Sequence, residues 1–271
     1  MVNKVIRVKG LTKVFETGTK ALDNVSLEVP KGQMLAMIGL SGSGKSTLMR
    51  HLNGLTRPTD GDIYVLDTHV NAAGKKELRE LRRHVGFIFQ QFGLVGRLTA
   101  IENVLSGSLG VLKGPRFGVG SYPLSLRKRA LENLDRVGLA DYAFQRADTL
   151  SGGQMQRTAI ARTLMQDPSI MLADEPVASL DPESSAQVMD IMLRIAREEH
   201  LTVVVTLHQV ELAMGWADRI VGLRDGKVVL DDEPKKIGKK KVMEVYKRVA
   251  PKGVDPEELA AESLSKIKAA G

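Results

Sequence analysis

The amino-acid sequence predicts an α/β fold with a mostly parallel sheet, an N-terminal antiparallel β part and an inserted α-helical subdomain. Three observations support this prediction. Before and after the middle of the chain, short apolar runs typical of strands alternate with segments of helical periodicity. Alternating strands and helices are typical of a parallel sheet. One such run ends in a glycine-rich loop that enters a helix. Between Gln91 and Gln166 the strand signals vanish, and helical patterns surround an irregular stretch.

The individual elements follow in chain order. Two short strand-like stretches, Val5–Val8 and Val25–Val29, form the N-terminal β part. Gln33–Gly39 (QMLAMIG) is an apolar run typical of a buried strand, and a helix is expected to begin near Lys45. Asp225-Gly226 predicts a terminal hairpin. Further strands are predicted at Asp62–Leu66, Val85–Phe89, Ile170–Asp174 and Thr202–Leu207, and helices at Glu183–Glu199 and Gln209–Ala217.

We expect one domain at residues 1–250, with the helical subdomain at about 91–166 inserted in it, and a C-terminal helical extension at 251–271. The extension is predicted from DPEELAAESLSKIKAAG, which begins with an Asp N-cap and a Pro at the first helical position. The alternative for this segment is a solvated terminus.

Composition excludes several classes of protein. With 271 residues and 43% hydrophobic content the chain can bury a sizeable core, and the absence of Cys excludes disulfides and thiol catalysis. The start, MVNKVIRVKG, alternates as a strand does, which favours a cytoplasmic location over secretion. Apolar runs are far shorter than the roughly 18–20 residues that span a bilayer. The net charge is +7, but ten Lys and Arg against six Asp and Glu lie after residue 232, so no nucleic-acid partner is expected.

The stretch GLSGSGKST (Gly39–Thr47) fits G-x-x-x-x-G-K-[ST], and the predicted strand before it and helix after it are the context that this motif requires. Glycines let backbone N–H groups surround a phosphate, and the helix N-terminus adds a partial positive charge. Lys45 is expected to reach the β and γ phosphates, and Ser46 to bind Mg²⁺. The stretch therefore predicts a P-loop NTPase core, with a flexible turn as the alternative.

Two adjacent acids end the apolar strand SIMLADEP, where a P-loop protein places its metal-linked carboxylate. Asp174 is expected to hold the Mg²⁺ shell, and Glu175 to orient or deprotonate water. His208 closes the strand TVVVTLH at the same edge of the sheet, so its imidazole can contact the γ-phosphate. Gln90, after HVGFIF, can reach the metal or the water, and Phe15 can stack on an adenine ring. The alternative for the two adjacent acids is a solvated turn. For His208, Gln90 and Phe15 the alternative is a side chain without a functional role.

A second anion-binding candidate lies in LSGGQ. The sequence Ser151-Gly152-Gly153-Gln154 satisfies an S-x-x-Q capping box, so a plain helix start is one interpretation. Capping does not explain two consecutive glycines, each of which costs up to about 1 kcal/mol relative to Ala inside a helix. Bare backbone N–H groups at a positive helix end are what a closely approaching phosphate needs. The chain thus has two predicted phosphate sites.

The motifs as a set resemble those of the ATP-binding cassette ATPases, over about Val5–Val249. In family order they are Phe15, the P-loop, the Q-loop FQQF with Gln90, the signature LSGGQ, the Walker B segment IMLADE, the D-loop SLDP and the switch residue His208. The resemblance implies that ATP and Mg²⁺ are held between the P-loop of one protomer and the signature of the other, in a head-to-tail homodimer. The two phosphate sites of one chain would then serve two different ATP molecules.

The resemblance implies roles for the site residues. Glu175, His208 and Gln90 would be catalytic, and Ser46, Gln90 and Asp174 would bind the metal. The nucleotide contacts would be Phe15, Gly39, Ser41, Gly42, Ser43, Gly44, Lys45, Ser46, Thr47, Ser151, Gly152, Gly153, Gln154 and Asp181.

Within the family, Gln90–Gly110 and Glu175–Pro182 are most similar to the ATPase subunits of phosphonate or phosphite importers. This similarity implies integral-membrane permease subunits that contact the helical insertion, and indirectly a periplasmic or extracellular solute-binding protein. The expected location is peripheral, on the cytoplasmic face of the inner membrane. The alternatives are an importer of another solute, an exporter of lipoproteins or macrolides, and a soluble cassette ATPase that acts in DNA repair or translation. A P-loop GTPase is disfavoured because the N-K-x-D pattern is absent.

Overall fold

The computed structural model of the protein describes residues 3–114 and 117–246. Its strands are β1 (Lys4–Val14), β2 (Lys20–Pro30), β3 (Met34–Ile38), β4 (Asp60–Val65), β5 (Thr68–His69), β6 (Val85–Ile88), β7 (Ile170–Ala173), β8 (Thr202–Leu207), β9 (Arg219–Arg224) and β10 (Lys227–Asp232). Its α-helices are α1 (Lys45–Leu52), α2 (Lys75–His84), α3 (Ala100–Ser106), α4 (Leu124–Arg136), α5 (Gly152–Leu164), α6 (Pro182–Glu198), α7 (Val210–Trp216) and α8 (Lys239–Tyr246). The short 3-10 helices are η1 (Gly107–Gly110), η2 (Val119–Ser121), η3 (Ala140–Tyr142), η4 (Ala147–Thr149) and η5 (Pro234–Lys236).

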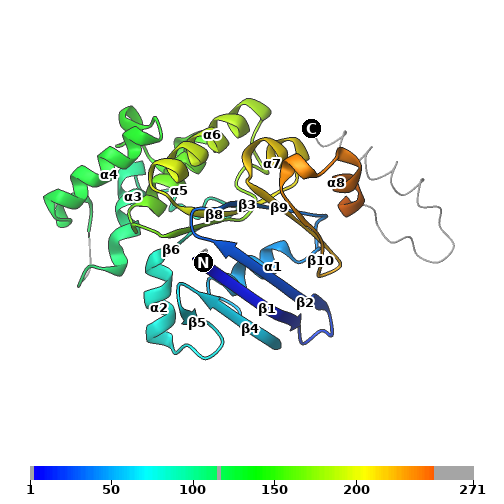
Figure 1. Cartoon of the computed structure of the whole chain (residues 1–271). Coiled ribbons are helices and arrows are strands. Elements are labelled where there is room, and N and C mark those ends of the chain that lie inside the picture. Colours follow the sequence, from blue (N-terminus) through cyan, green and yellow to red (C-terminus); the bar gives the residue numbers. More distant parts are fainter. Residues whose placement is uncertain (1–2, 115–116, 247–271) are drawn as a thin grey trace.

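The described strands form two sheets (Figure 1). The smaller sheet is antiparallel, in the order β2-β1-β4-β5. The larger sheet has the order β10-β9-β3-β8-β7-β6, and its neighbours are parallel except in the β9-β10 hairpin. This arrangement confirms the predicted α/β class, its mostly parallel sheet and its N-terminal antiparallel part.

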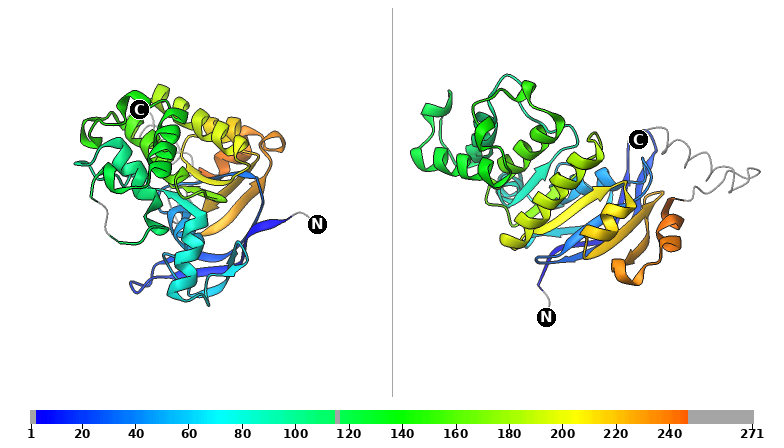
Figure 2. Two further views of the ribbon diagram at one scale, coloured as in Figure 1. Left: turned by 90° about the vertical axis from the view of Figure 1, so that its left-hand side faces the viewer. Right: turned by 90° about the horizontal axis from the view of Figure 1, so that it is seen from above.

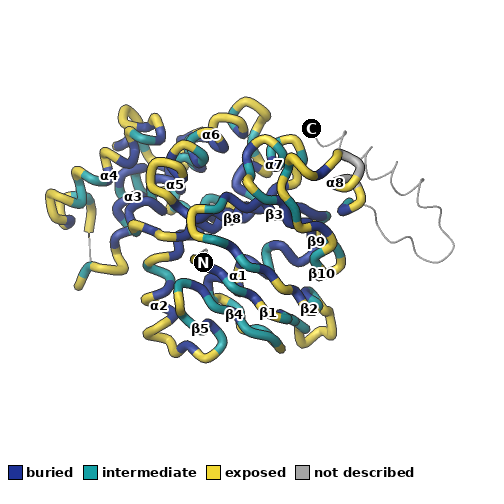
Figure 3. Tube along the Cα trace, viewed as in Figure 1, coloured by how far each residue is buried: buried dark blue, intermediate teal, exposed yellow. Residues whose placement is uncertain are grey.

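Both faces of the larger sheet are covered, which explains why its strands are apolar throughout. Successive side chains of β3 enter two different cores, because side chains alternate across a strand. Leu35 and Met37 pack with α1 and the smaller sheet, whereas Ala36 and Ile38 pack with α6, α7 and the helical insertion. The burial pattern in Figure 3 shows this central layer as almost wholly buried.

The segment between β6 and β7 contains α3, α4 and α5, which stand together to one side of the larger sheet (Figures 1 and 2). The predicted helical insertion is therefore present. The two helices that the sequence reasoning missed are α2 and α8; α2 (KKELRELRRH) is highly charged and buries only Leu78 and Leu81. The predicted extension at 251–271 lies outside the described residues, and the domain boundaries stay predictions.

The fold places the candidate site at one edge of the larger sheet. Strands β3, β8 and β7 are parallel neighbours, so their carboxyl ends lie at the same edge. The residues that follow Ile38, Ala173 and Leu207 therefore meet there, which is where open α/β sheets bind ligands.

Candidate functional site

The loop between β3 and α1 requires glycine at defined positions. Gly39, Gly42 and Gly44 have φ angles of 150°, 80° and 104°, a region that other L-residues rarely adopt. A Cβ atom on Gly39 would lie 2.2 Å from the carbonyl oxygen of Leu223, and one on Gly44 would lie 2.6 Å from that of Ala21. The loop backbone is therefore packed against β9 and β2, and its shape depends on these glycines.

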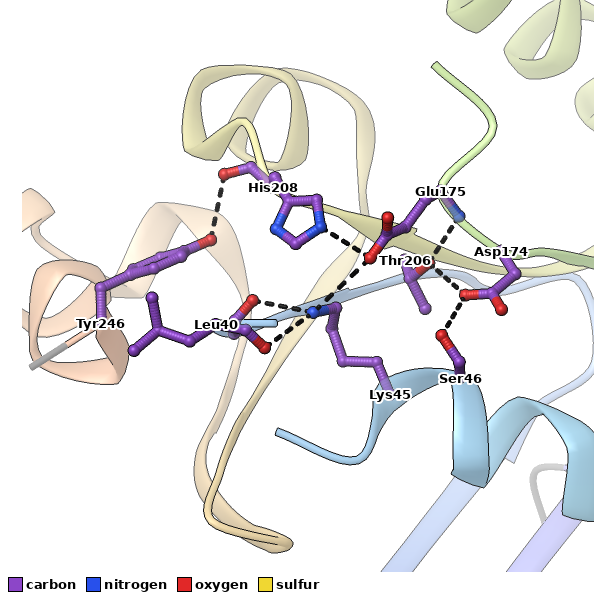
Figure 4. Close-up of polar contacts among 9 residues, drawn as sticks. Leu40, Lys45, Ser46, Asp174, Glu175, Thr206, His208 and Tyr246 are labelled. Carbon is purple, nitrogen blue, oxygen red and sulfur yellow. Dashed lines mark hydrogen bonds and ion pairs between the residues drawn. The ribbon is translucent and has the colours of Figure 1, made fainter. Parts of the chain in front are cut away.

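Lys45 begins α1 and is almost completely buried, with 3% of its surface exposed. Its ammonium donates to the carbonyl oxygens of Gly39 and Leu40 at 2.8 and 3.1 Å and lies 3.9 Å from Oε1 of Glu175 (Figure 4). Burial lowers the pKa of Lys45, and the carboxylates of Glu175 and Asp174 oppose this shift. The side chain is thus a cation enclosed by the loop and the two acids.

Asp174, directly after β7, is held by two hydroxyl groups. Ser46 and Thr206 donate to its Oδ1 at 2.9 and 3.0 Å. The same Thr206 hydroxyl accepts from the backbone N–H of Glu175 at 2.7 Å, so it positions both acids. The sequence analysis missed Thr206. The available signal was the second of the two threonines in TVVVTL, which lies near the end of strand β8 and close to the predicted site.

Glu175 and His208 form a close pair. Nε2 of His208 lies 2.6 Å from Oε1 of Glu175, and the backbone of Glu175 is left-handed, with φ of 50°. The hydrogen bond from His208 is the main cause that holds the pKa of Glu175 below its ordinary value. Partial burial opposes this effect, and the charges of His208 and Lys45 add to it. The carboxylate is therefore ionised at neutral pH and can accept a proton or orient a water molecule.

Ser46 and Asp174 fit a magnesium site. Their oxygens face each other at 2.9 Å, and hydroxyl and carboxylate oxygens are ligands that Mg²⁺ prefers. Among the described residues no group of three or more His, Asp or Glu side chains gathers as a metal cage. Such a site would be completed by phosphate and water oxygens, as is usual for Mg²⁺ at nucleotides.

The remaining predicted residues of the P-loop and sheet edge lie around this cluster. Ser41 is exposed, whereas Ser43 is buried and its Oγ has no hydrogen-bond partner among the described residues. Gln90 is exposed just after β6. Phe15 is 42% exposed after β1, and the Lys13 ammonium lies 5.4 Å from its ring centroid. These positions leave the polar groups of Ser41 and Gln90 and the ring of Phe15 accessible.

The signature forms a separate cluster at the start of α5. Ser151 is the N-cap: its Oγ accepts from the N–H of Gln154 at 3.2 Å, and its own N–H donates to Oε1 of Gln154 at 2.8 Å. The predicted capping box is thus present. A Cβ on Gly152 would lie 3.0 Å from Leu180, and one on Gly153 would lie 3.2 Å from Ser184. The two glycines therefore also permit close packing on the D-loop and α6, a reason that the sequence did not reveal.

Asp181 caps α6, its carboxylate accepting from the N–H of Ser184 at 2.9 Å. The side-chain and backbone hydrogen bonds of Ser184 lower the pKa of Asp181. The D-loop residue is thus ordered by its own helix.

Arg162, on α5, is a second residue that the sequence analysis missed. Its guanidinium donates to the carbonyl oxygens of Phe92, at 3.0 Å, and of Gly93. Both acceptor residues have left-handed backbones, with φ of 55° and 62°. Burial lowers the pKa of Arg162. The Q-loop is thereby attached to the signature helix.

The fold and the site define the class of protein: a P-loop ATPase with an inserted helical segment that carries a second glycine-containing helix start. The chain belongs to the ABC transporter family, whose model matches residues 22–178, and it is an ATPase of that family. None of the helices among the described residues has the length and hydropathy that crossing a bilayer takes.

Individual proteins support this assignment. The phosphate-import ATP-binding protein PhnC of Mycolicibacterium smegmatis is 58% identical, over 91% of this chain and 94% of the relative. The phosphonates import ATP-binding protein PhnC of Nocardia farcinica is 52% identical, over 96% and 97%. Among solved structures, the dimeric ATP-binding cassette MJ0796 bound to ADP and Pi has a TM-score of 0.75 and 36% identity, covering 86% of this chain and all of that chain.

Proposed function

We propose that this chain is the ATP-hydrolysing subunit of an importer for a phosphonate or phosphite. It works as a head-to-tail homodimer bound to permease subunits on the cytoplasmic face of the inner membrane. The observation that carries the proposal is the joined cluster of Lys45, Ser46, Asp174, Glu175 and His208, in a chain whose relatives are named for phosphonate or phosphate import. The names of the relatives support a phosphorus oxyanion as the solute, and the cluster supports ATP hydrolysis as the reaction.

The residues divide the work of hydrolysis. Backbone N–H groups of the P-loop bind the phosphates, and the Lys45 ammonium exchanges its two loop carbonyls for phosphate oxygens. Ser46 and Asp174 would hold Mg²⁺, which would neutralise charge on the phosphates. Glu175 accepts a proton from the attacking water while His208 fixes its carboxylate at 2.6 Å. Gln90 and Phe15 supply contacts to the metal or water and to the adenine.

The dimer arrangement is supported by the lack of any hydrogen bond or ion pair, among the described residues, between the two phosphate clusters. The polar groups of Figure 4 come from the ends of β3, β7 and β8 and from α1 and α8, whereas Ser151 and Gln154 at the start of α5 hydrogen-bond each other. In the proposed two-fold dimer the signature of one chain would face the P-loop of its partner, so the pair would form two equivalent sites. ATP between them then contributes binding energy only to the closed state.

A mixing experiment tests this arrangement. Lys45→Ala and Ser151→Arg chains carry different affinity tags, and heterodimers are isolated with ATP through both tags. In the head-to-tail arrangement both defects fall in one site, so the heterodimer keeps one intact site and recovers ATP binding over either homodimer. The matched control pairs a wild-type chain with a chain that carries both changes, which leaves no intact site. Recovery in the control, and none in the first mixture, would show that both loops of one chain serve the same ATP.

A growth experiment tests the solute. Cells that lack this chain should lose growth on a phosphonate or phosphite as sole phosphorus source, and the wild-type gene should restore it, whereas a Glu175→Gln variant should not. Growth on phosphate is measured in parallel because one relative is named for phosphate import. Unchanged growth on phosphonates and phosphite, with loss of uptake of phosphate or of another solute, would contradict the proposed substrate.

A further inference from the structure

The last described helix, α8, is fixed closely against the larger sheet. Val242 and Val245 are completely or almost completely buried, with 0% and 1% of their surfaces exposed. A Cβ on Gly222 of β9 would lie 2.6 Å from Cγ2 of Val245, so glycine is what lets the helix approach. Arg224 donates to the carbonyl oxygen of Glu244 at 3.1 Å, near the C-terminal end of the helix. The position of α8 along β9 is therefore well defined.

Tyr246, at the end of α8, reaches from this anchored helix into the ATP site. Its hydroxyl donates to the backbone carbonyl of His208 at 3.1 Å (Figure 4). The phenol also lies near the backbone of Gly39, which opposes the effect of burial on its pKa. The hydroxyl group therefore connects α8 with the end of β8, close to the start of the P-loop. Burial raises the pKa of Tyr246 to about 12, so the phenol keeps its proton at neutral pH and can donate to the carbonyl.

The carbonyl that Tyr246 holds belongs to the residue whose ring contacts Glu175. A His side chain has only two rotatable bonds, so fixing its backbone restricts where Nε2 can lie. Nε2 of His208 lies 2.6 Å from Oε1 of Glu175, and its side chain is 40% exposed, so little packing holds the ring itself. The hydrogen bond from Tyr246 thus holds the His208 carbonyl, in addition to the pairing of the preceding Leu207 with Ile38 in the sheet.

We propose that Tyr246 is a positioning residue for ATP hydrolysis: its hydroxyl fixes the backbone of His208 relative to the anchored helix α8 and so keeps the imidazole on Glu175. The inference rests on the proposed role of His208 in hydrolysis. It assigns a function in the active site to α8, which lies far along the chain from every motif of the family resemblance except the switch residue.

The test replaces Tyr246 with Phe in the full chain, which keeps the ring and removes the hydroxyl. We expect kcat for ATP to fall about 2- to 13-fold, the rate equivalent of one neutral hydrogen bond. The KM for ATP should change less than about twofold, because the loss affects the arrangement of His208 and not the phosphate contacts. Tyr64→Phe, which removes a hydroxyl from β4 of the smaller sheet, is the matched control and should leave kcat unchanged. The urea midpoint, followed by fluorescence of the single Trp216, shows whether each variant is folded.

A double-mutant cycle with His208→Ala separates positioning from a merely structural role. Single-turnover rates make slow hydrolysis measurable. If Tyr246 acts through His208, its replacement causes no further loss once the imidazole is gone. Equal losses in both backgrounds, an unchanged kcat, or a fall explained by KM alone would overturn the inference. Failure of His208→Ala to slow hydrolysis would instead contradict the proposed function, so the two failures are distinguishable.

Discussion

Thr206→Val tests whether one buried hydroxyl holds both acids of the site. The change keeps the shape of the side chain but removes the donor to Asp174 at 3.0 Å and the acceptor for the Glu175 N–H at 2.7 Å. Thr206 is completely buried, so water does not readily replace the lost partner. A hydrogen bond to a charged group contributes about 1.5–3 kcal/mol, and a buried unpaired donor costs about 1–3 kcal/mol. Since the two effects overlap, we expect a loss of roughly 2–4 kcal/mol in the free energy of unfolding.

The assay is urea unfolding followed by Trp216 fluorescence, together with the steady-state ATPase rate. A loss near 3 kcal/mol in the free energy of unfolding would lower the urea concentration at the midpoint by about 1 M, when that free energy falls by about 3 kcal/mol for each 1 M of urea. The rate should fall at least about tenfold, because Asp174 and Glu175 lose a shared support. Thr206→Ser is the matched control: it keeps the hydroxyl, loses one methyl group at about 1 kcal/mol, and should retain most activity. A Val variant as stable and active as the Ser variant would refute the reasoning.

Three further predictions follow from the same structure. Glu175→Gln should keep ATP binding and nearly abolish hydrolysis, because the amide keeps the shape but loses basicity; gel filtration should then show a stable dimer with ATP, and wild-type turnover would exclude a base role. Gly222→Ala should lower the unfolding midpoint and displace α8, since the new Cβ meets Val245 at 2.6 Å, whereas Gly215→Ala, which meets nothing within 4 Å, should not. His51 is fully buried, its Nε2 has no hydrogen-bond partner among the described residues, and burial lowers its pKa. The unfolded chain therefore binds more protons below the ordinary His pKa of about 6.5, so the free energy of unfolding should fall between about pH 7 and 5.5, by at most about 1.4 kcal/mol per pH unit. In His51→Gln this dependence should flatten, and an equally steep loss would contradict it.

The sequence predicted those parts of the site whose chemistry depends on neighbouring residues in the chain. The P-loop glycines, Lys45 and Ser46 form one short motif, and the acids of IMLADE directly follow a buried strand, so their proximity required only a parallel sheet. His208 was expected at the same sheet edge as a contact to the γ-phosphate, and its hydrogen bond to Glu175 at 2.6 Å was not predicted.

The other parts could not be predicted because they depend on contacts between distant segments. Arg162 reaches carbonyls 69 and 70 positions away, and Tyr246 reaches one 38 positions away. A backbone carbonyl has no side-chain signature, so nothing in the sequence identifies such an acceptor. Helix α2 was missed for another reason. Only two of its residues, Leu78 and Leu81, are buried, and two apolar positions in a highly charged segment are too few to show a helical period in the sequence.

The attachment of Arg162 to the Q-loop has a mechanical consequence. Helix α5 runs from Gly152 to Leu164. Near its C-terminal end the guanidinium of Arg162 donates to the carbonyls of Phe92 and Gly93, and the signature glycines lie at its N-terminal end. Ten residues at 1.5 Å each separate Arg162 from Gly152, a rigid arm of about 15 Å. In the proposed complex, a force that a permease subunit applies to the Q-loop would therefore be carried along this arm to the signature glycines Gly152 and Gly153.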